Sequence, residues 1–286
     1  MINFLKFRFI YFGISALVIC SGLLSMFFYG YRTSIDFSGG TILEYQIGAH
    51  IDLKQLNMQL EKKKLHPISH EQSGSKITLR FPPLNVTDEK TVLELVKKTS
   101  NGEATVLRSE TVGATLGKET ITKTIIAAMV AIVGILIYMT FAFKSFNFAI
   151  AAIVALAHDL LVMAGWYSIV SHFFGAELNT LFVTALLTTM SFSVHDTIII
   201  FDKIREYRRS KIEDIQISAN RALTETLIRS VNNSMTIVFM LLALILFGGS
   251  TIRFFIVALL IGTVTGTYSS PFVATPFLVW LENRRK

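Results

Sequence analysis

Six long apolar segments run along the chain, and polar residues border each of them. The hydrocarbon core of a bilayer is about 30 Å thick, so a helix needs about 20 mostly apolar residues to cross it. The first segment lacks the short apolar core and small-residue cleavage site of a signal peptide, so we interpret it as a retained span. The pattern predicts a polytopic α-helical membrane protein with six transmembrane helices, over 10–31, 121–143, 146–170, 178–201, 231–247 and 254–281.

The polar region between the first two spans has a different pattern. Ile77, Leu79 and Phe81 alternate with polar residues, which is typical of a half-buried strand. Other parts of this region carry apolar residues at helical spacing or in further strand-like runs. We predict a small α+β domain with strands over 41–47, 76–81 and 104–112 and helices over 52–64 and 87–99. The predicted division is 1–31 for the N-terminus and first helix, 32–120 for this domain, and 121–286 for a five-helix transmembrane domain.

Composition narrows the classes of protein. Of the 286 residues, 52% are hydrophobic and 16% are charged, which is unlike an ordinary soluble or disordered chain. Cys20 is the only cysteine, so the chain cannot form an intrachain disulfide or a multi-cysteine metal site. The sequence has no Ser-His-Asp order, no zinc-protease motif and no dinucleotide fingerprint. We therefore expect no enzyme activity and no cofactor or metal.

Basic residues mark one side of the predicted spans. With six spans both termini lie on the same side, and both are basic, the second through the tail 284–286. Lys144 and the charged segment 202–230, predicted as a loop, fall on that side too. Because cytoplasmic loops are enriched in Lys and Arg, we expect cytoplasmic termini and an extracytoplasmic domain over 32–120. Orientation and anionic headgroups explain the net charge of +7 better than nucleic-acid binding does.

Two carboxylates lie inside predicted spans, each directly after a histidine. The pairs are His158-Asp159 and His195-Asp196. An ionisable group inside a span costs roughly 2.5–3.5 kcal/mol on insertion scales, so each is a candidate functional residue. Thr189, Ser193 and Asp196 recur at intervals of four and three, which gives the fourth span a polar stripe.

A second polar stripe begins the fifth span. Its members are Arg229, Asn232, Asn233 and Thr236. Because the two spans are consecutive, the Asp196 carboxylate and the Arg229 guanidinium could meet. Burial favours the neutral form of a carboxyl group and a nearby guanidinium favours the charged form, so Asp196 is a candidate proton carrier. Two alternatives stay open: a fixed structural ion pair, or an Arg229 side chain that extends to the cytoplasmic headgroups.

The other polar or small residues carry weaker signals. Neighbours on a helix point about 100° apart, so we expect no direct relay between His158 or His195 and the adjacent carboxylate. Either histidine could instead form an interhelix hydrogen bond, while Asp159 and His195 stay candidates for the proton path. Gly262, Gly266 and Ser270 in the sixth span form a stripe that permits close helix approach. Asp36, Gly39 and Gly40 after the first span are typical of a rigid turn.

Several motifs together resemble the SecF family of protein translocase subunits, relatives of the resistance-nodulation-division transporters. Nearly the whole chain is covered, and the most specific segment is Ser193-Val-His-Asp-Thr-Ile-Ile-Ile-Phe-Asp-Lys-Ile-Arg-Glu206, which contains Asp202. One departure is His195, because the family usually has Asn before the aspartate. The supporting motifs are Asp36-Phe-Ser-Gly-Gly-Thr41, Val112-Gly-Ala-Thr-Leu-Gly117, His158-Asp159, Thr226-Leu-Ile-Arg-Ser230, Phe247-Gly-Gly249 and Gly266-Thr-Tyr-Ser-Ser270.

The resemblance implies a function and a set of partners. Such a subunit works in the bacterial inner membrane with SecD, and often YajC, beside the SecYEG channel and the SecA motor. The complex uses the proton-motive force to help draw an unfolded preprotein outward. Asp196 and Arg229 fall on family positions associated with proton transport. Two other functions stay open, a proton-coupled small-molecule exporter of the same superfamily and a passive scaffold subunit of the translocase.

Overall fold

The computed structural model describes residues 3–48, 51–100, 103–143, 145–210 and 214–284. Of the basic residues that we used to predict orientation, Lys144, Lys211, Arg285 and Lys286 lie outside these ranges. The chain divides into two compact units. One unit comprises Met1–Arg32 and Ile126–Lys286, and the other comprises Thr33–Ile125.

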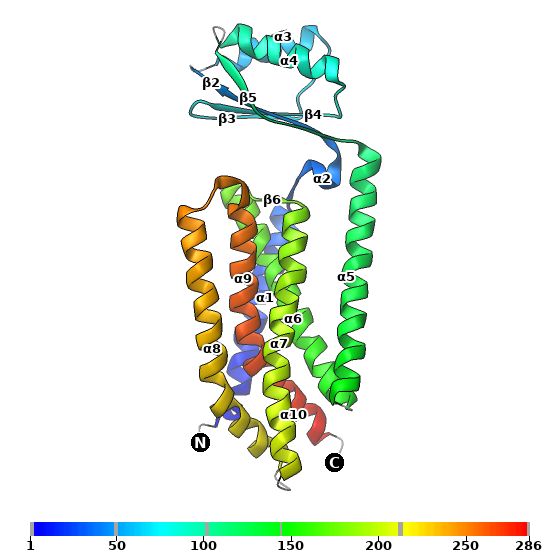
Figure 1. The fold of residues 1–286 in the computed structure, drawn as a ribbon, viewed down its shortest axis with the longest axis vertical. Coiled ribbons are helices and arrows are strands. Elements are labelled where there is room, and N and C mark those ends of the chain that lie inside the picture. The colour runs from blue at the N-terminus through cyan, green and yellow to red at the C-terminus, as the bar shows by residue number, and fades with distance from the viewer. Residues whose placement is uncertain (1–2, 49–50, 101–102, 144, 211–213, 285–286) are drawn as a thin grey trace. The chain divides into compact units, whose positions relative to one another are not determined.

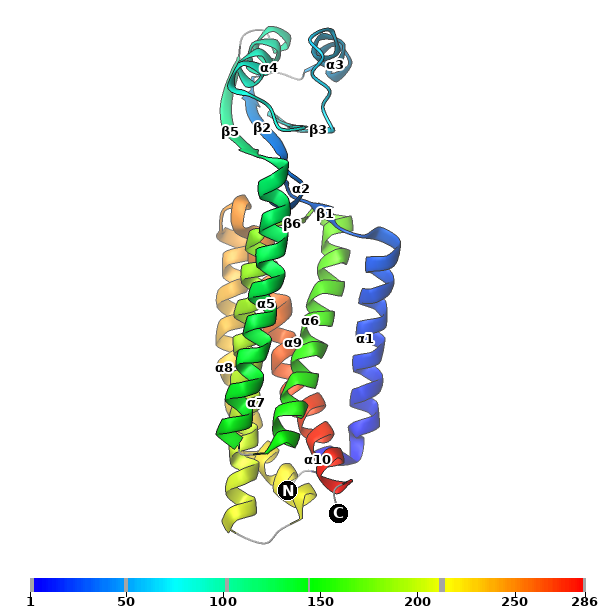
Figure 2. The ribbon, with the colours of Figure 1, turned by 90° about the vertical axis from the view of Figure 1, so that its right-hand side faces the viewer.

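Within the described residues, six helical segments are long and apolar enough to cross a membrane, which confirms the predicted fold class. The third of them, α6, lies between α1 and α9 (Figures 1 and 2). The segments are η1 with α1 (Phe4–Phe7, Arg8–Tyr29), α5 (Ala114–Phe143), α6 (Phe146–Phe174), α7 (Thr180–Ser210), α8 (Ile215–Phe247), and η2, α9, η3 and α10 in succession (Ser250–Ile252, Arg253–Ser269, Ser270–Ala274, Thr275–Asn283).

Helices α1 and α6 are in close backbone contact. A Cβ atom added to Gly22 would lie 2.8 Å from the Cα atom of Gly165, so neither position tolerates a side chain without a shift. One turn further along, the Ser25 hydroxyl donates to the Ser168 hydroxyl at 3.1 Å. Small residues thus let two membrane helices approach and exchange hydrogen bonds. The short strands β1 (Arg32–Thr33) and β6 (Glu177–Leu178) follow α1 and α6.

The segment 202–230, which we expected to be a loop, is helical over most of its length. Helix α7 continues to Ser210 and α8 begins at Ile215. Ile204, Ala219 and Leu223 are buried in the same core as the transmembrane residues. Ile204 is on the buried face of α7, and Ala219 and Leu223 are on the buried face of α8. Amphipathic turns therefore extend both helices beyond the apolar runs. The charged residues on the opposite faces interrupted the apolar pattern, and that interruption explains the error.

The last span contains a wide turn at a proline. Residues Ser270–Ala274 form the π-helix η3 between α9 and α10, with Pro271 near its start. Proline has no N–H group, so it disturbs the regular hydrogen-bond ladder. The Ser270 carbonyl is satisfied by the backbone N–H and the hydroxyl of Thr275, the latter at 3.0 Å. The Ser270 hydroxyl lies 2.8 Å from the Thr197 hydroxyl of α7.

The smaller unit is a four-stranded antiparallel sheet covered by two helices. The strands are β2 (Gly40–Ile47), β3 (Ser69–Ser73), β4 (Lys76–Phe81) and β5 (Ala104–Val112), in the order β3-β4-β2-β5. Helices α3 (Leu53–Lys62) and α4 (Val86–Thr99) cover one face, where Leu43 pairs with Leu79 and Tyr45 with Ile77 (Figures 1 and 2). Strand β3 was not predicted, because Ser-His-Glu-Gln-Ser has no apolar alternation.

Candidate functional site

Helices α7 and α9 pack through two matching stripes of small and hydroxyl residues. A Cβ atom on Gly262 would lie 2.3 Å from Cγ2 of Thr189, and one on Gly266 would lie 3.1 Å from Cβ of Ser193. Gly262 is therefore needed for this approach, and a side chain at Gly266 would require its neighbour to shift by a few tenths of an ångström. The stripes are Thr189, Ser193 and Thr197 on α7, opposite Gly262, Gly266 and Ser270.

The third pair of these stripes is joined by hydrogen bonds. The hydroxyls of Thr197 and Ser270 lie 2.8 Å apart, and the Ser270 hydroxyl also approaches the Ser193 carbonyl at 3.1 Å. The sequence pattern predicted a close-packing surface at Gly262 and Gly266. It did not predict that hydroxyl groups of α7 would line the other side.

The Asp159 carboxylate joins three helices at the centre of the larger unit. It is buried, with 6% of the residue exposed. Its Oδ2 atom accepts hydrogen bonds from Ser193 of α7 at 2.5 Å and from Ser269 of α9 at 2.7 Å. Its Oδ1 atom lies 2.9 Å from Nδ1 of His158. Charge-assisted hydrogen bonds of this kind are stronger than bonds between neutral groups, so Asp159 fixes α6 against α7 and α9.

The prediction that the histidine and the adjacent carboxylate point away from each other is wrong for His158 and Asp159. Their Cα–Cβ bonds do point in different directions around the helix, but both side chains are long enough to turn toward each other. The other ring nitrogen of His158, Nε2, is buried and has no hydrogen-bond partner among the described residues. An unpaired buried polar atom is costly and calls for an explanation.

Asp196 is buried on the neighbouring face of α7, but its partner is not the one that we expected. Its Oδ2 atom accepts a 2.6 Å hydrogen bond from Ser230 of α8. Arg229 is exposed, and its side chain makes no hydrogen bond or ion pair with any residue that the structure describes. The structure therefore brings Asp196 to α8 without bringing it to the guanidinium.

The polar face of α8 also differs from the predicted one. Asn232, Asn233 and Thr236 are exposed. The buried positions are instead occupied by hydroxyl residues with a spacing of four. These are Thr226, Ser230 and Ser234. Their spacing is visible in the sequence, but the stripe that contains Arg229 has the same period, and only the neighbouring helices decide which stripe turns inward.

Cavities lie on both sides of the Asp196–Ser230 contact along α7 and α8. The larger one has a volume of about 480 Å³ and is bordered by charged residues, including Asp202, Glu225 and Arg229, and by Thr226 one turn before Ser230. A much smaller one is bordered by Asp196 itself and by Ser234 and other residues of α7, α8 and α9. The carboxylate thus stands between a polar vestibule and a small internal cavity.

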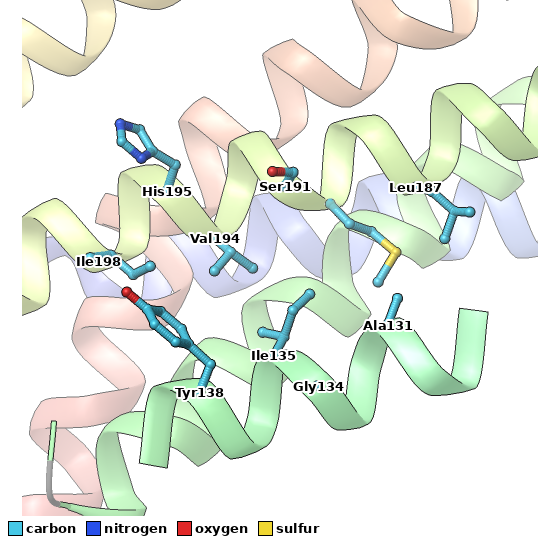
Figure 3. A pocket seen from close by; sticks show the side chains of 10 residues that line it. Ala131, Gly134, Ile135, Tyr138, Leu187, Ser191, Val194, His195 and Ile198 are labelled. Atoms are coloured by element: carbon cyan, nitrogen blue, oxygen red, sulfur yellow. The ribbon is translucent and has the colours of Figure 1, made fainter. Parts of the chain in front are cut away.

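The His195 side chain is directed away from the Asp196–Ser230 contact. It is exposed and borders a cavity of about 470 Å³ between α5 and α7, which is otherwise mostly apolar. In Figure 3 the side chains of Ile135 and Tyr138 on α5 face Val194 and Ile198 on α7, while the His195 ring points away from α5. No hydrogen bond joins His195 to any described residue, so it and Asp196 diverge as the helix geometry predicts.

Asp36, Gly39 and Gly40 lie in the smaller unit. Asp36 is in the short helix α2 (Ile35–Ser38), and Gly39 caps the C-terminal end of this helix. Gly39 has φ +71°, and a Cβ atom there would lie 2.8 Å from the Cα atom of Ala114. Gly117, from the second motif, would place a Cβ atom 2.9 Å from the Gly39 backbone nitrogen. Two motifs far apart in the sequence thus meet here, and glycine is required by both conformation and space.

Within the described ranges, no three His, Cys, Asp or Glu side chains come together as a set that could hold a metal ion. The residues that we missed include two hydroxyl residues, Ser230 and Ser269. Each of them donates to one of the two buried carboxylates.

Comparisons with known proteins agree with the fold and with the motifs. The family model described as "Protein export membrane protein SecD/SecF, C-terminal" matches residues 91–284. The protein translocase subunit SecF of Thermobaculum terrenum is 38% identical over 99% of this chain and 95% of its own length. The protein translocase subunit SecDF of Thermus thermophilus is 35% identical over 90% of this chain, which spans 35% of that longer protein.

A solved structure has the same fold. The crystal structure of SecDF, a translocon-associated membrane protein from Thermus thermophilus, matches with a TM-score of 0.85 and 31% identity. The match covers 99% of this chain and 39% of the SecDF chain. The relatives are named as translocase subunits and so as transport components, which confirms the prediction that the chain is not an enzyme. The chain belongs to the SecD/SecF family of protein-export membrane proteins.

Proposed function

We propose that the chain is a proton-driven subunit of a protein-export translocase, and that Asp196 carries the proton. The observation that supports this most is the position of Asp196, which is buried between helices and borders the small internal cavity, while the polar vestibule begins at Thr226 and Arg229, next to its partner Ser230. Because a buried carboxylate in a membrane span is costly, its presence favours a functional role.

Among the described residues Asp196 has one side-chain hydrogen bond, from Ser230, and this suits a group that changes its charge. A carboxyl group that accepts one hydroxyl is less strongly held in its charged form than one that accepts several donors, so protonation requires little rearrangement. Ser230 can donate to the carboxylate or accept from the protonated acid, because a hydroxyl is both donor and acceptor. Asp196 then alternates between charged and neutral forms without losing its partner.

Arg229 is the second proposed member of the proton path. It borders the polar vestibule one residue from Ser230, so a rotation of α8 by part of a turn would bring its guanidinium toward Asp196. A guanidinium stays charged and would favour release of the proton. We also keep Asp159 and His195 as candidates, Asp159 through its contact with α7 and His195 beside Asp196 in sequence.

We propose a SecD-type protein as the partner. The support is the SecDF relative, in which one chain bears both names and of which this chain matches 35%. YajC, SecYEG, SecA and an unfolded preprotein are the further partners that the family resemblance implies. We place the protein in the inner membrane, with cytoplasmic termini and the α+β domain over 32–120 outside. This orientation follows from the distribution of basic residues.

Proton uptake by the reconstituted complex tests the proposal. The chain, purified with its SecD partner and placed in lipid vesicles, should take up protons down an imposed gradient. Asp196→Asn keeps the size and the Ser230 hydrogen bond but cannot ionise, so it should abolish uptake while SecD still co-purifies. Uptake by the variant equal to that of the unaltered chain would contradict the proposal and favour a passive scaffold.

A further inference from the structure

We propose that His158 and Asp159 form a second proton-binding site, separate from Asp196, which receives its proton at Nε2 of His158. The inference rests on the proposed function for its purpose, because a proton-driven subunit would use such a site. Its evidence is independent of Asp196 and comes from the side chains of α6 and their contacts with α7 and α9.

The site has one atom without a partner. Nδ1 of His158 is 2.9 Å from Oδ1 of Asp159, and an ionised Asp159 can only accept, so the ring then donates from Nδ1. Nε2 is buried and unpartnered among the described residues, although only 7% of His158 is exposed. With Nδ1 protonated, Nε2 of a neutral ring carries a lone pair. A lone pair in a buried, otherwise satisfied cluster is the position at which a proton would bind.

The proton balance of the step is simple. One proton binds Nε2, and the proton on Nδ1 passes along the existing hydrogen bond to Oδ1 of Asp159. The ring is neutral before and after, but its proton has moved from Nδ1 to Nε2. The carboxylate becomes a neutral carboxylic acid. The net change is one proton taken up and one negative charge lost from the centre of three helices.

Loss of that charge should loosen the junction. Oδ2 of Asp159 accepts from Ser193 and Ser269, and such bonds are about twice as strong to a carboxylate as to a neutral acid. Ser193 lies three residues before Asp196 on α7 and faces Gly266 of α9. Protonation of Asp159 would therefore ease movement of α7 past α9, and α7 also carries the Asp196 site.

The surroundings contain few other ionisable groups. Helix α9 contributes Tyr268, whose ring centre is 6.2 Å from that of His158, and its hydroxyl donates to the Tyr11 carbonyl of α1. Tyr11 is the ionisable residue of α1 in this cluster, where it stacks at an angle on Phe272 of η3. Helix α7 contributes Asp196, and Glu282 of α10 is paired with Arg208 instead.

Infrared spectroscopy tests the site directly on the full chain in lipid nanodiscs. Aspartate labelled with carbon-13 gives a carbonyl band for the protonated acid that is distinct from the carboxylate bands. As the pH is lowered, we expect two buried carboxyl groups to protonate. Asp159→Asn should remove one of the two signals, and Asp196→Asn should remove the other and leave the first in place.

Measurements on His158 distinguish a proton relay from a static hydrogen bond. His158→Gln can still donate to Asp159 but cannot pass a proton, so the protonated-acid band of Asp159 should not appear over the pH range in which it appears in the unaltered chain. In the unaltered chain, nitrogen-15 spectra of the His158 ring should show the proton moving from Nδ1 to Nε2 over the same pH range. This second measurement decides the matter if Asp159→Asn does not fold.

Three results would overturn the proposal: an unchanged set of carboxyl signals in folded Asp159→Asn, a protonated-acid band of Asp159 in His158→Gln over the same pH range as in the unaltered chain, or a His158 ring that keeps its proton on Nδ1 throughout. Failure of the proposed function looks different. In that case Asp196→Asn leaves proton uptake intact, whatever happens to the Asp159 signal.

Discussion

Ser230 of α8 donates a 2.6 Å hydrogen bond to Asp196 of α7, and this bond joins the two helices at the level where a cavity opens on either side. The bond replaces the expected meeting of Asp196 and Arg229. It also defines the resting contact from which a rotation of α8 would start. Tests of the proposed mechanism therefore begin at Ser230.

Ser230→Ala should weaken export and stability together. The Asp196 carboxylate would lose the one hydrogen bond that the structure gives it, and an unsatisfied buried acceptor costs about 1–3 kcal/mol. Thermal unfolding in detergent measures the stability change. Thr236→Ala is the matched control, because it removes an exposed hydroxyl from the same helix and should change neither quantity. Equal behaviour of the two variants would show that the Ser230 bond is unimportant.

Arg229→Ala should reduce export with little loss of stability. The side chain is exposed and forms no ion pair or hydrogen bond within the described ranges, so its removal breaks no contact. Arg229→Lys keeps the positive charge and should retain part of the activity. A large fall in unfolding temperature for Arg229→Ala would instead indicate a structural ion pair, which was one of the alternatives at the sequence level.

Gly262→Ala should destabilise the α7–α9 contact by about 1–3 kcal/mol, because the added carbon would lie 2.3 Å from Thr189. Unfolding measurements with Gly134→Ala as the control separate this clash from general effects of removing a helical glycine, since Gly134 has open space around it. Adding Thr189→Ala should restore part of the loss. If Gly262→Ala and Gly134→Ala behave alike, the two stripes are not in tight contact.

Gly39→Ala should destabilise the smaller unit. Its φ of +71° is unfavourable for alanine, and the new carbon would lie 2.8 Å from the Cα atom of Ala114. Strain of this kind costs about 1–3 kcal/mol. Limited proteolysis compares the variant with Gly113→Ala, a neighbouring glycine with no atom within 4 Å of the added carbon. Equal protease resistance of the two variants would contradict the required close approach.

The apolar pattern predicted much of the fold, because the rules that relate the spacing of apolar residues to helices and strands are local. Apolar runs predicted all six membrane helices, and the alternation over Lys76–Phe81 predicted β4 with its bounds. The helix ends near Ser210 and Ile215 were missed, because amphipathic turns beyond an apolar run depend on a core that the sequence does not display. Strand β3 was missed because it is polar and depends on pairing with β4.

The site was only partly predictable for a related reason. Asp159 and Asp196 could be found because carboxylates are unusual in a span, and the stripe of Gly262 and Gly266 could be found from its four-residue spacing. The choice between the Arg229 face and the Ser230 face of α8 depends on which helices surround it. The His158–Asp159 bond depends on side-chain rotamers, which helix periodicity alone does not determine.

Preprotein export in cells that carry Asp196→Asn tests proton chemistry at Asp196 most directly. The unaltered chain and the variant are compared at matched protein levels, with co-purification of the SecD partner as the check on assembly. We expect export to fall to the level of cells that lack the chain, while assembly is unchanged. Normal export by the assembled variant would contradict a proton-carrying role for Asp196 and leave it as a packing residue beside Ser230.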